Sequence, residues 1–99
     1  MSPANGGLVM DGAPAIMIQI SQCESKLRQF NDDGSVVRGP TKDIGLFQIA
    51  PFWIPTAKKL GYDVFTERGN ISFALWLYKQ QGTSPWNSSK YCWNAPADG

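Results

Sequence analysis

Residues 15–30 read AIMIQISQCESKLRQF, the most regular stretch in a chain of 99 residues. Its apolar side chains recur at steps of four, three, four and three positions: Ile16, Ile20, Cys23, Leu27 and Phe30. This spacing places them on one face of a helix, so the stretch predicts a helix over residues 15–30. Glu24 follows Cys23 at the edge of that apolar face, where a carboxyl group would be partly shielded from water.

The rest of the chain is predicted to be mostly helical, with one small β-hairpin. Asn31-Asp32-Asp33-Gly34 is a strong turn signal. It predicts a short strand over residues 35–38, and residues 43–49 then return as a second strand or as a turn into the next helix. Further helices are expected over residues 54–60 and 66–82, followed by a short helical turn over 84–92. The predicted fold class is therefore α+β, dominated by α.

Length and charge limit the organisation and the partners of the chain. Residues 15–93 are expected to form one domain, with a flexible arm or linker remnant over 1–14 and a tail over 94–99. The net charge is +1, from nine basic and eight acidic residues. No basic stripe is present, so nucleic acid is not expected as a partner. No run of 18 apolar residues is present either, so no membrane span is expected.

Two cysteines and the absence of histidine limit the chemistry further. Zinc sites need more ligands than these, so no metal site is expected. Cys23 and Cys92 are either two buried thiols or a disulfide. The disulfide is favoured, because it would close a loop of roughly 70 residues and stabilise the fold by about 4 kcal/mol in the loop-entropy model. Such a bond is typical of small exported domains, so we expect a secreted or cell-wall-associated protein, extracellular or periplasmic.

Carboxylate chemistry remains available to this chain. Mechanisms built on Ser-His-Asp or Cys-His sets are excluded by composition, whereas glycoside cleavage needs only carboxyl groups. Glu24 could hold its proton because desolvation raises the pKa of a carboxyl group. Asp43 lies in a more solvated turn, where it would stay ionised. The competing interpretations are a solvated surface glutamate at position 24 and a turn-capping aspartate at position 43.

Two motifs in order resemble the lysozyme and lytic transglycosylase superfamily. The first is Cys23-Glu24-Ser25, and the second is DIGLFQI over residues 43–49, which begins nineteen positions after Glu24. The second motif and the turn before it are similar to the hairpin of animal-type lysozymes. The cysteine before Glu24, the Gly-x-x-Pro-Trp over residues 82–86 and the late Cys-Trp are similar to resuscitation-promoting factors. Residues 66–82 resemble the superfamily's central helix, so the resemblance covers about residues 15–93.

The resemblance implies a lysozyme-like fold with a cleft between the Glu24 helix and the hairpin, and a Cys23–Cys92 disulfide. It implies that Glu24 is the catalytic acid, that Asp43 stabilises the glycosyl cation, and that Gln48 faces the sugar. Three aromatic residues are candidates for packing on sugar rings, each against a core interpretation: Trp53, Tyr78 and Trp86. Phe47, Asn70 and Trp76 are expected to be structural.

The implied activity is cleavage of peptidoglycan at the β-1,4 bond between N-acetylmuramic acid and N-acetylglucosamine, by hydrolysis or by lytic transglycosylation. The chain would act as a monomer on the glycan strand and would need no cofactor. Two alternatives from other classes remain: a catalytically silent glycan-binding or partner-binding module on the same fold, and a small extracellular structural domain. A catalytic glutamate in the motif favours the enzyme.

Overall fold

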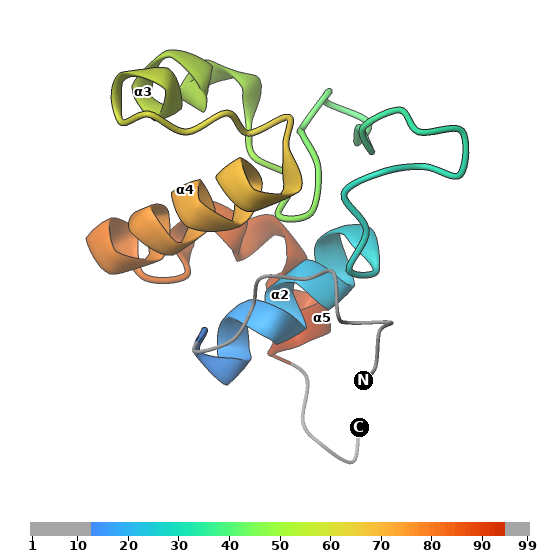
Figure 1. The fold of residues 1–99 in the computed structure, drawn as a ribbon. Coiled ribbons are helices and arrows are strands. Elements are labelled where there is room, and N and C mark those ends of the chain that lie inside the picture. The colour runs from blue at the N-terminus through green and yellow to red at the C-terminus, as the bar shows by residue number, and fades with distance from the viewer. Residues whose placement is uncertain (1–12, 95–99) are drawn as a thin grey trace.

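Residues 13–94 are the part of the chain that the computed structural model describes, and they form six helical segments (Figure 1). Four are α-helices: α2 (Ala15–Ser25), α3 (Ile54–Lys59), α4 (Glu67–Gln81) and α5 (Lys90–Trp93). Two are 3-10 helices: η1 (Pro51–Trp53) and η2 (Ser84–Ser89). The predicted predominance of helix is confirmed. Most of the expected arm (1–14) and tail (94–99) lies outside the described residues.

Helix α2 begins where the sequence predicts and ends five residues early. Lys26 and Leu27 both have left-handed backbone angles, with φ of 59° and 62°. Their N–H groups donate to the carbonyls of Gln22 and Ser21, which closes the helix end. Ser25 Oγ then donates to the carbonyl of Leu46 at 2.8 Å and ties this end to the following loop. The predicted apolar stripe is therefore cut short, and Phe30 is 43% exposed.

The later helices lie close to the predicted ranges 54–60 and 66–82, and residues at their ends explain where they start and stop. Thr66 caps α4 by accepting a hydrogen bond from the Gly69 N–H at 3.0 Å. Gly82 follows the last residue of α4 with a φ of 65°, and Gly61 follows α3 with a φ of 87°. These ends depend on neighbours in sequence, so they are predictable without the tertiary structure.

The predicted β-hairpin is replaced by a looped segment. Within residues 13–94 no strand is present, and three isolated antiparallel bridges pair Phe30 with Val36, Arg38 with Ile44, and Ile44 with Ile49. The turn at residues 31–34 is formed, because the Asn31 N–H donates to the Ser35 carbonyl at 2.7 Å. Residues 43–49 were predicted to form either a second strand or a turn into the next helix, and they form a turn. Ile44 and Ile49 exchange two backbone hydrogen bonds of 2.9 Å across it.

Two buried side-chain amides explain why this segment needs no strand partner. Gln29 Oε1 accepts the Leu46 N–H at 2.8 Å, and Asn70 Oδ1 accepts the Phe47 N–H at 2.8 Å. Asn70 Nδ2 donates to the Ile44 carbonyl at 2.9 Å. Backbone groups that a hairpin would pair with a second strand are thus satisfied by side chains from elsewhere. Asn70 is structural, as predicted.

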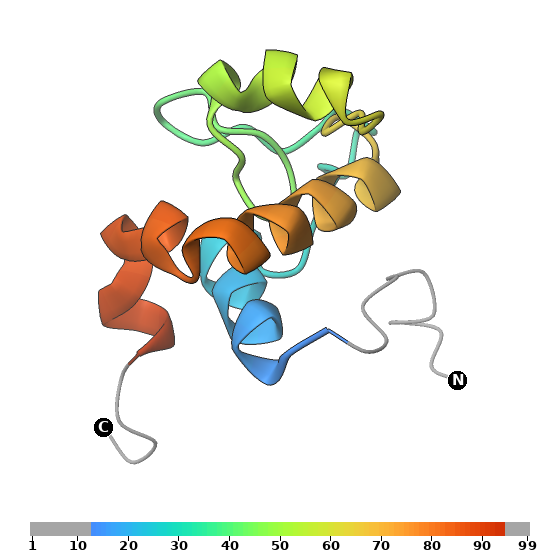
Figure 2. The same ribbon diagram turned by 90° about the vertical axis from the view of Figure 1, so that its left-hand side faces the viewer.

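The hydrophobic core lies where α2, the 44–49 turn, α4 and η2 meet. Its largest fully buried members include Phe47, Phe73, Met17 and Ile20. Figure 2 shows α4 running between α3 on one side and α2 on the other, with η2 and α5 beside α2. Among residues 13–94, none of the helices has the length and apolar character that crossing a membrane requires.

A disulfide joins the two ends of this arrangement. Cys23 in α2 and Cys92 in α5 are bonded, with their Cα atoms 6.0 Å apart and 69 positions apart in sequence. The favoured sequence interpretation is therefore confirmed. Helices η2 and α5 are short, and the disulfide holds them against α2, the helix that carries Glu24.

Removing the disulfide should destabilise the fold. We expect the Cys23→Ser/Cys92→Ser double variant to lose roughly 2–5 kcal/mol in free energy of unfolding, because the unfolded chain regains the freedom of a long open loop. Urea unfolding with and without reductant measures this loss. Reductant should lower the stability of the wild type and leave that of the double variant unchanged. Equal midpoints for the wild type with and without reductant would contradict the prediction.

Candidate active site

Glu24 lies in the last turn of α2, and its side chain is half-buried. Burial raises the pKa of Glu24 above its ordinary value of 4.5, because loss of water disfavours the carboxylate. The hydrogen bond from Ser89 Oγ to Glu24 Oε2 opposes this increase, and the negative charge of Asp43 adds to it. The net pKa is raised. Glu24 therefore keeps its proton to a higher pH than an exposed glutamate does, as its place on the helix predicts.

The disulfide explains why Ser89 lies beside Glu24. Cys23 is the residue before Glu24, and Cys92 is one helical turn after Ser89. The covalent bond therefore brings the end of η2 to the end of α2 that carries Glu24. Ser89 was not singled out by sequence reasoning. Its distance from Cys92, combined with the Cys23-Glu24 pair, is the signal that could have found it.

Asp43 and Gln48 occupy the two ends of the turn held by Gln29 and Asn70. Asp43 is partly buried and accepts a hydrogen bond from Thr41 Oγ1 at 2.9 Å. Gln48 has a left-handed backbone, with a φ of 50°, and its Nε2 donates to the Gly45 carbonyl at 2.9 Å. The amide is thus tied to its own turn.

An open pocket of about 190 Å³ lies beside this turn. Its walls come from the turn, η1, the end of α4 and η2, and its polar members are Asp43, Gln48, Gln81 and Ser84. Its aromatic members are Phe52, Trp53 and Trp86. Four of the sequence candidates are therefore brought together here: Asp43, Gln48, Trp53 and Trp86. Glu24 and Tyr78 are not among the lining residues.

Glu24 is nevertheless linked to this pocket in two ways. The field of Asp43, a lining residue, acts on the Glu24 carboxyl group. Ser89, its hydrogen-bond donor, ends the same short helix whose Ser84, Pro85 and Trp86 line the pocket. Tyr78 lies on α4, partly buried and packed against the core. Tyr78 itself does not line the pocket, although Leu77 and Gln81 of the same helix do.

The aromatic candidates differ in how they could meet a ligand. Trp53 is partly exposed on the pocket wall, whereas Trp86 is only 2% exposed and donates its indole N–H to the Phe47 carbonyl at 2.9 Å. Trp86 therefore packs in the core behind the pocket. Phe52, which sequence reasoning did not select, is 72% exposed and lies 5.0 Å from the Trp53 ring. Phe52 lies in the three-residue helix η1, which is too short for hydrophobic periodicity to distinguish a surface ring from a core ring.

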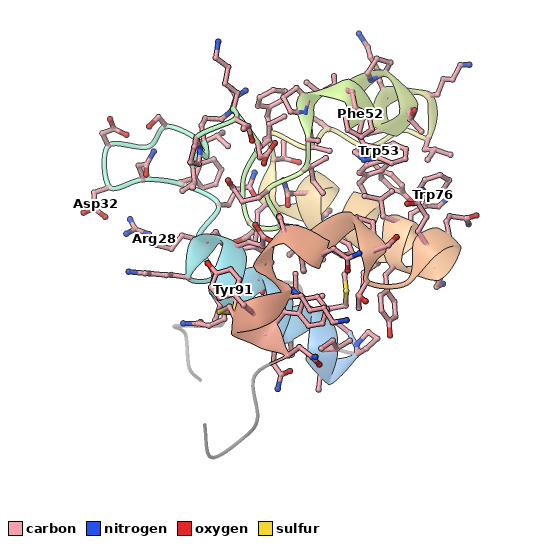
Figure 3. The ribbon with its side chains drawn as sticks, turned by 180° about the vertical axis from the view of Figure 1, so that it is seen from behind. Arg28, Asp32, Phe52, Trp53, Trp76 and Tyr91 are labelled. Atoms are coloured by element: carbon pink, nitrogen blue, oxygen red, sulfur yellow. A yellow bond between two sulfur atoms is a disulfide. The ribbon has the colours of Figure 1, made fainter. Side chains whose placement is uncertain are left out.

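A row of rings extends from this edge of the pocket into the core. Figure 3 shows Phe52, Trp53 and Trp76 following one another along the same side of the molecule, away from Arg28 and Asp32. Phe73 connects them, with its ring 5.8 Å from Trp53 and 5.6 Å from Trp76. Trp76 is partly buried against the core, consistent with its predicted structural role. The exposed end of the row is thereby held in place by its buried end.

Glu24→Gln should change how stability depends on pH. The folded-state pKa of Glu24 is raised, so its protonation favours the folded state. That contribution is complete below the unfolded-state pKa near 4.5 and is lost as pH rises through the folded-state pKa. The stability of Glu24→Gln relative to wild type should therefore increase from about pH 4 to about pH 8, as urea unfolding at each pH would measure. A difference that stays constant over this range would contradict a raised pKa.

No known protein family model matches this chain, and neither a curated protein nor a solved structure does so.

Proposed function

We propose that this chain is a lysozyme-like enzyme that cleaves peptidoglycan at the β-1,4 bond between N-acetylmuramic acid and N-acetylglucosamine. The observation that carries the proposal is a half-buried glutamate with a raised pKa, within the field of an aspartate that lines an open pocket. Two carboxyl groups in different surroundings are what acid-assisted glycoside cleavage requires. Lysozyme is itself the reference case for this pairing, so the roles are assigned by resemblance.

The reaction begins at the Glu24 carboxyl group. Glu24 donates its proton to the glycosidic oxygen as the bond from that oxygen to the anomeric carbon breaks. The sugar left behind carries positive charge at the anomeric carbon, and the Asp43 carboxylate stabilises this charge. A water molecule then gives its hydroxide to the anomeric carbon and its proton to Glu24, which restores the acid. In lytic transglycosylation the sugar's own 6-hydroxyl group takes the place of water.

The pocket supports a sugar polymer as the substrate. Gln48, Gln81 and Ser84 offer polar groups, and Trp53 and Phe52 offer ring faces on which the C–H face of a sugar can pack. We propose that the enzyme acts as a monomer in an oxidising compartment outside the cytoplasm, where the Cys23–Cys92 disulfide persists. Asp43 favours hydrolysis over transglycosylation, because a second carboxylate can stabilise the cation while water attacks.

Glu24→Gln should lower the rate of cell-wall clearing by about two to four orders of magnitude, the usual contribution of a general acid. A turbidity assay on purified walls measures this rate. Glu67→Gln is the matched control: it removes the chain's second glutamate, in the first turn of α4, and should leave clearing unchanged. Equal clearing by wild type and Glu24→Gln would exclude Glu24 as the acid. Binding of muropeptides without clearing by the wild type would indicate a silent binding module.

Mass spectrometry of the digested muropeptides separates the two reactions. New reducing ends support hydrolysis, and 1,6-anhydro ends support transglycosylation. Anhydro ends would contradict the expectation that Asp43 favours hydrolysis.

Truncation of the exposed rings should weaken glycan binding. We expect Phe52→Ala and Trp53→Ala each to raise the dissociation constant for a chitooligosaccharide roughly 5- to 10-fold, through loss of packing on the sugar. Titration calorimetry measures the dissociation constant, with both variants made in the Glu24→Gln background so that the sugar is not cleaved during the measurement. Tyr91→Ala is the control, because this ring is 83% exposed on α5 and lies outside the pocket. Equal loss with Tyr91→Ala would show that the pocket rings have no special role.

A further inference from the structure

The Ser89 hydroxyl group lies at the centre of a small polar cluster beneath two tryptophans. Its oxygen accepts a hydrogen bond from Trp93 Nε1 at 3.1 Å. Two acceptors lie within its own reach, namely Glu24 Oε2 and the Trp86 carbonyl oxygen, the latter at 3.1 Å. Trp86 and Trp93 are 2% and 8% exposed, so both groups that hold Ser89 in place belong to the buried interior.

A serine hydroxyl has one proton, so it can satisfy only one of these two acceptors at a time. The Trp86 carbonyl also receives a bond from Trp93 Nε1 at 3.2 Å, so it keeps a partner when Ser89 turns away. The Glu24 carboxylate has no other hydrogen-bond donor among the described residues. An ionised Glu24 therefore accepts the hydrogen bond of the Ser89 hydroxyl group, because hydrogen bonds to a charged acceptor are stronger than those to a neutral one.

We propose that Ser89 is a positioning residue for Glu24. The Ser89 hydroxyl group turns between the Trp86 carbonyl and Glu24 Oε2 as Glu24 loses and regains its proton. The inference rests on the proposed function. When Glu24 has given its proton to the glycosidic oxygen, Ser89 donates to Oε2 and stabilises the new negative charge. When water returns a proton to Glu24, that demand ends and Ser89 can donate to Trp86. No proton leaves Ser89 at any step.

The oxygen that Ser89 contacts also determines which oxygen carries the transferable proton. Because Oε2 lies against Ser89, Glu24 Oε1 is the oxygen left without a hydrogen bond to the described residues. Trp93 holds the Ser89 oxygen in place from the opposite side. The contact with Ser89 thus leaves Oε1 as the oxygen of Glu24 that is free to face a substrate.

Few other charged groups act on this carboxyl group. Helices α5 and η2 pack against α2. Helix η2 carries no titratable residue, and α5 carries Lys90 and Tyr91, both exposed. Lys26 follows at the end of α2 and is also exposed, and Asp43 is the charged residue that raises the pKa of Glu24. Burial and Asp43 raise the pKa of Glu24, and the hydrogen bond from Ser89 lowers it. Loss of the Ser89 hydroxyl group should therefore raise this pKa further.

The test measures the ionisation of Glu24 directly, without relying on activity. The chain has two glutamates, Glu24 and Glu67, so protein labelled with ¹³C at the glutamate carboxyl carbon gives two signals, which Glu67→Gln assigns. In Ser89→Ala we expect the Glu24 titration midpoint to move upward by about one pH unit, the size of one hydrogen bond to a charged group. The alkaline limb of the wall-clearing rate should move upward by the same amount.

Three further variants make the result specific. Ser88→Ala, an exposed neighbour in the same short helix, should leave the midpoint unchanged, and Ser89→Thr should restore it. Trp93→Phe keeps an aromatic side chain and removes the indole N–H, so it should give a smaller upward shift of the Glu24 midpoint even if Ser89→Ala fails to fold. An unchanged Glu24 midpoint in both Ser89→Ala and Trp93→Phe would overturn the proposal. If Ser89→Ala shifts the Glu24 midpoint but the wild type clears no walls, the hydrogen bond is real and the enzymatic function is wrong. The proposed role of Ser89 in the reaction would then be overturned as well.

Discussion

The fold depends on two buried amides that replace a β-ladder. Gln29, just after α2, and Asn70, in the first turns of α4, hold the backbone of the 44–47 turn from two sides. Both amides also donate to the Val64 carbonyl, at 3.1 Å and 2.8 Å. A Cβ at Gly45 would collide with both of them, so the turn requires glycine there as well as its φ of 69°. Without these bonds, backbone groups would be buried without partners.

The candidate site is built on this constraint. The turn carries Asp43 at one end and Gln48 at the other, and the chain then continues directly into η1 with its two pocket rings. On the opposite side, the disulfide holds Ser89 against Glu24. The two carboxyl groups therefore belong to separately anchored segments, one anchored by amides and the other by a covalent bond. This separation lets their surroundings differ, as the proposed acid and stabilising roles require.

Sequence reasoning was accurate where neighbours in sequence determine the outcome. The start of α2 after Pro14, the Thr66 cap and the glycines that follow α3 and α4 are local, and all were predictable. The end of α2 was not, because Ser25, its last residue, is bonded to the distant Leu46 just before the left-handed Lys26 and Leu27. The predicted hairpin is not confirmed: this segment of the described residues has isolated antiparallel bridges, and two side-chain amides, whose role no local pattern indicates, bond to its backbone.

The site candidates divide in the same way. Composition left carboxylate chemistry open, and the motifs pointed to Glu24 and Asp43, whereas the burial of Trp86 and the exposure of Phe52 depend on packing that periodicity does not report. Ser89 is one of several serines in the chain, and only a three-dimensional contact distinguishes it.

Trp86 links the two halves of the site through one residue. Its indole N–H is bonded to the turn at Phe47, and its carbonyl accepts bonds from the cluster that contacts Glu24. A displacement of the turn is therefore transmitted through a rigid, buried ring to the surroundings of the acid. The surroundings of Asp43 and of Glu24 are therefore mechanically coupled through Trp86, although the two residues are 19 positions apart in sequence.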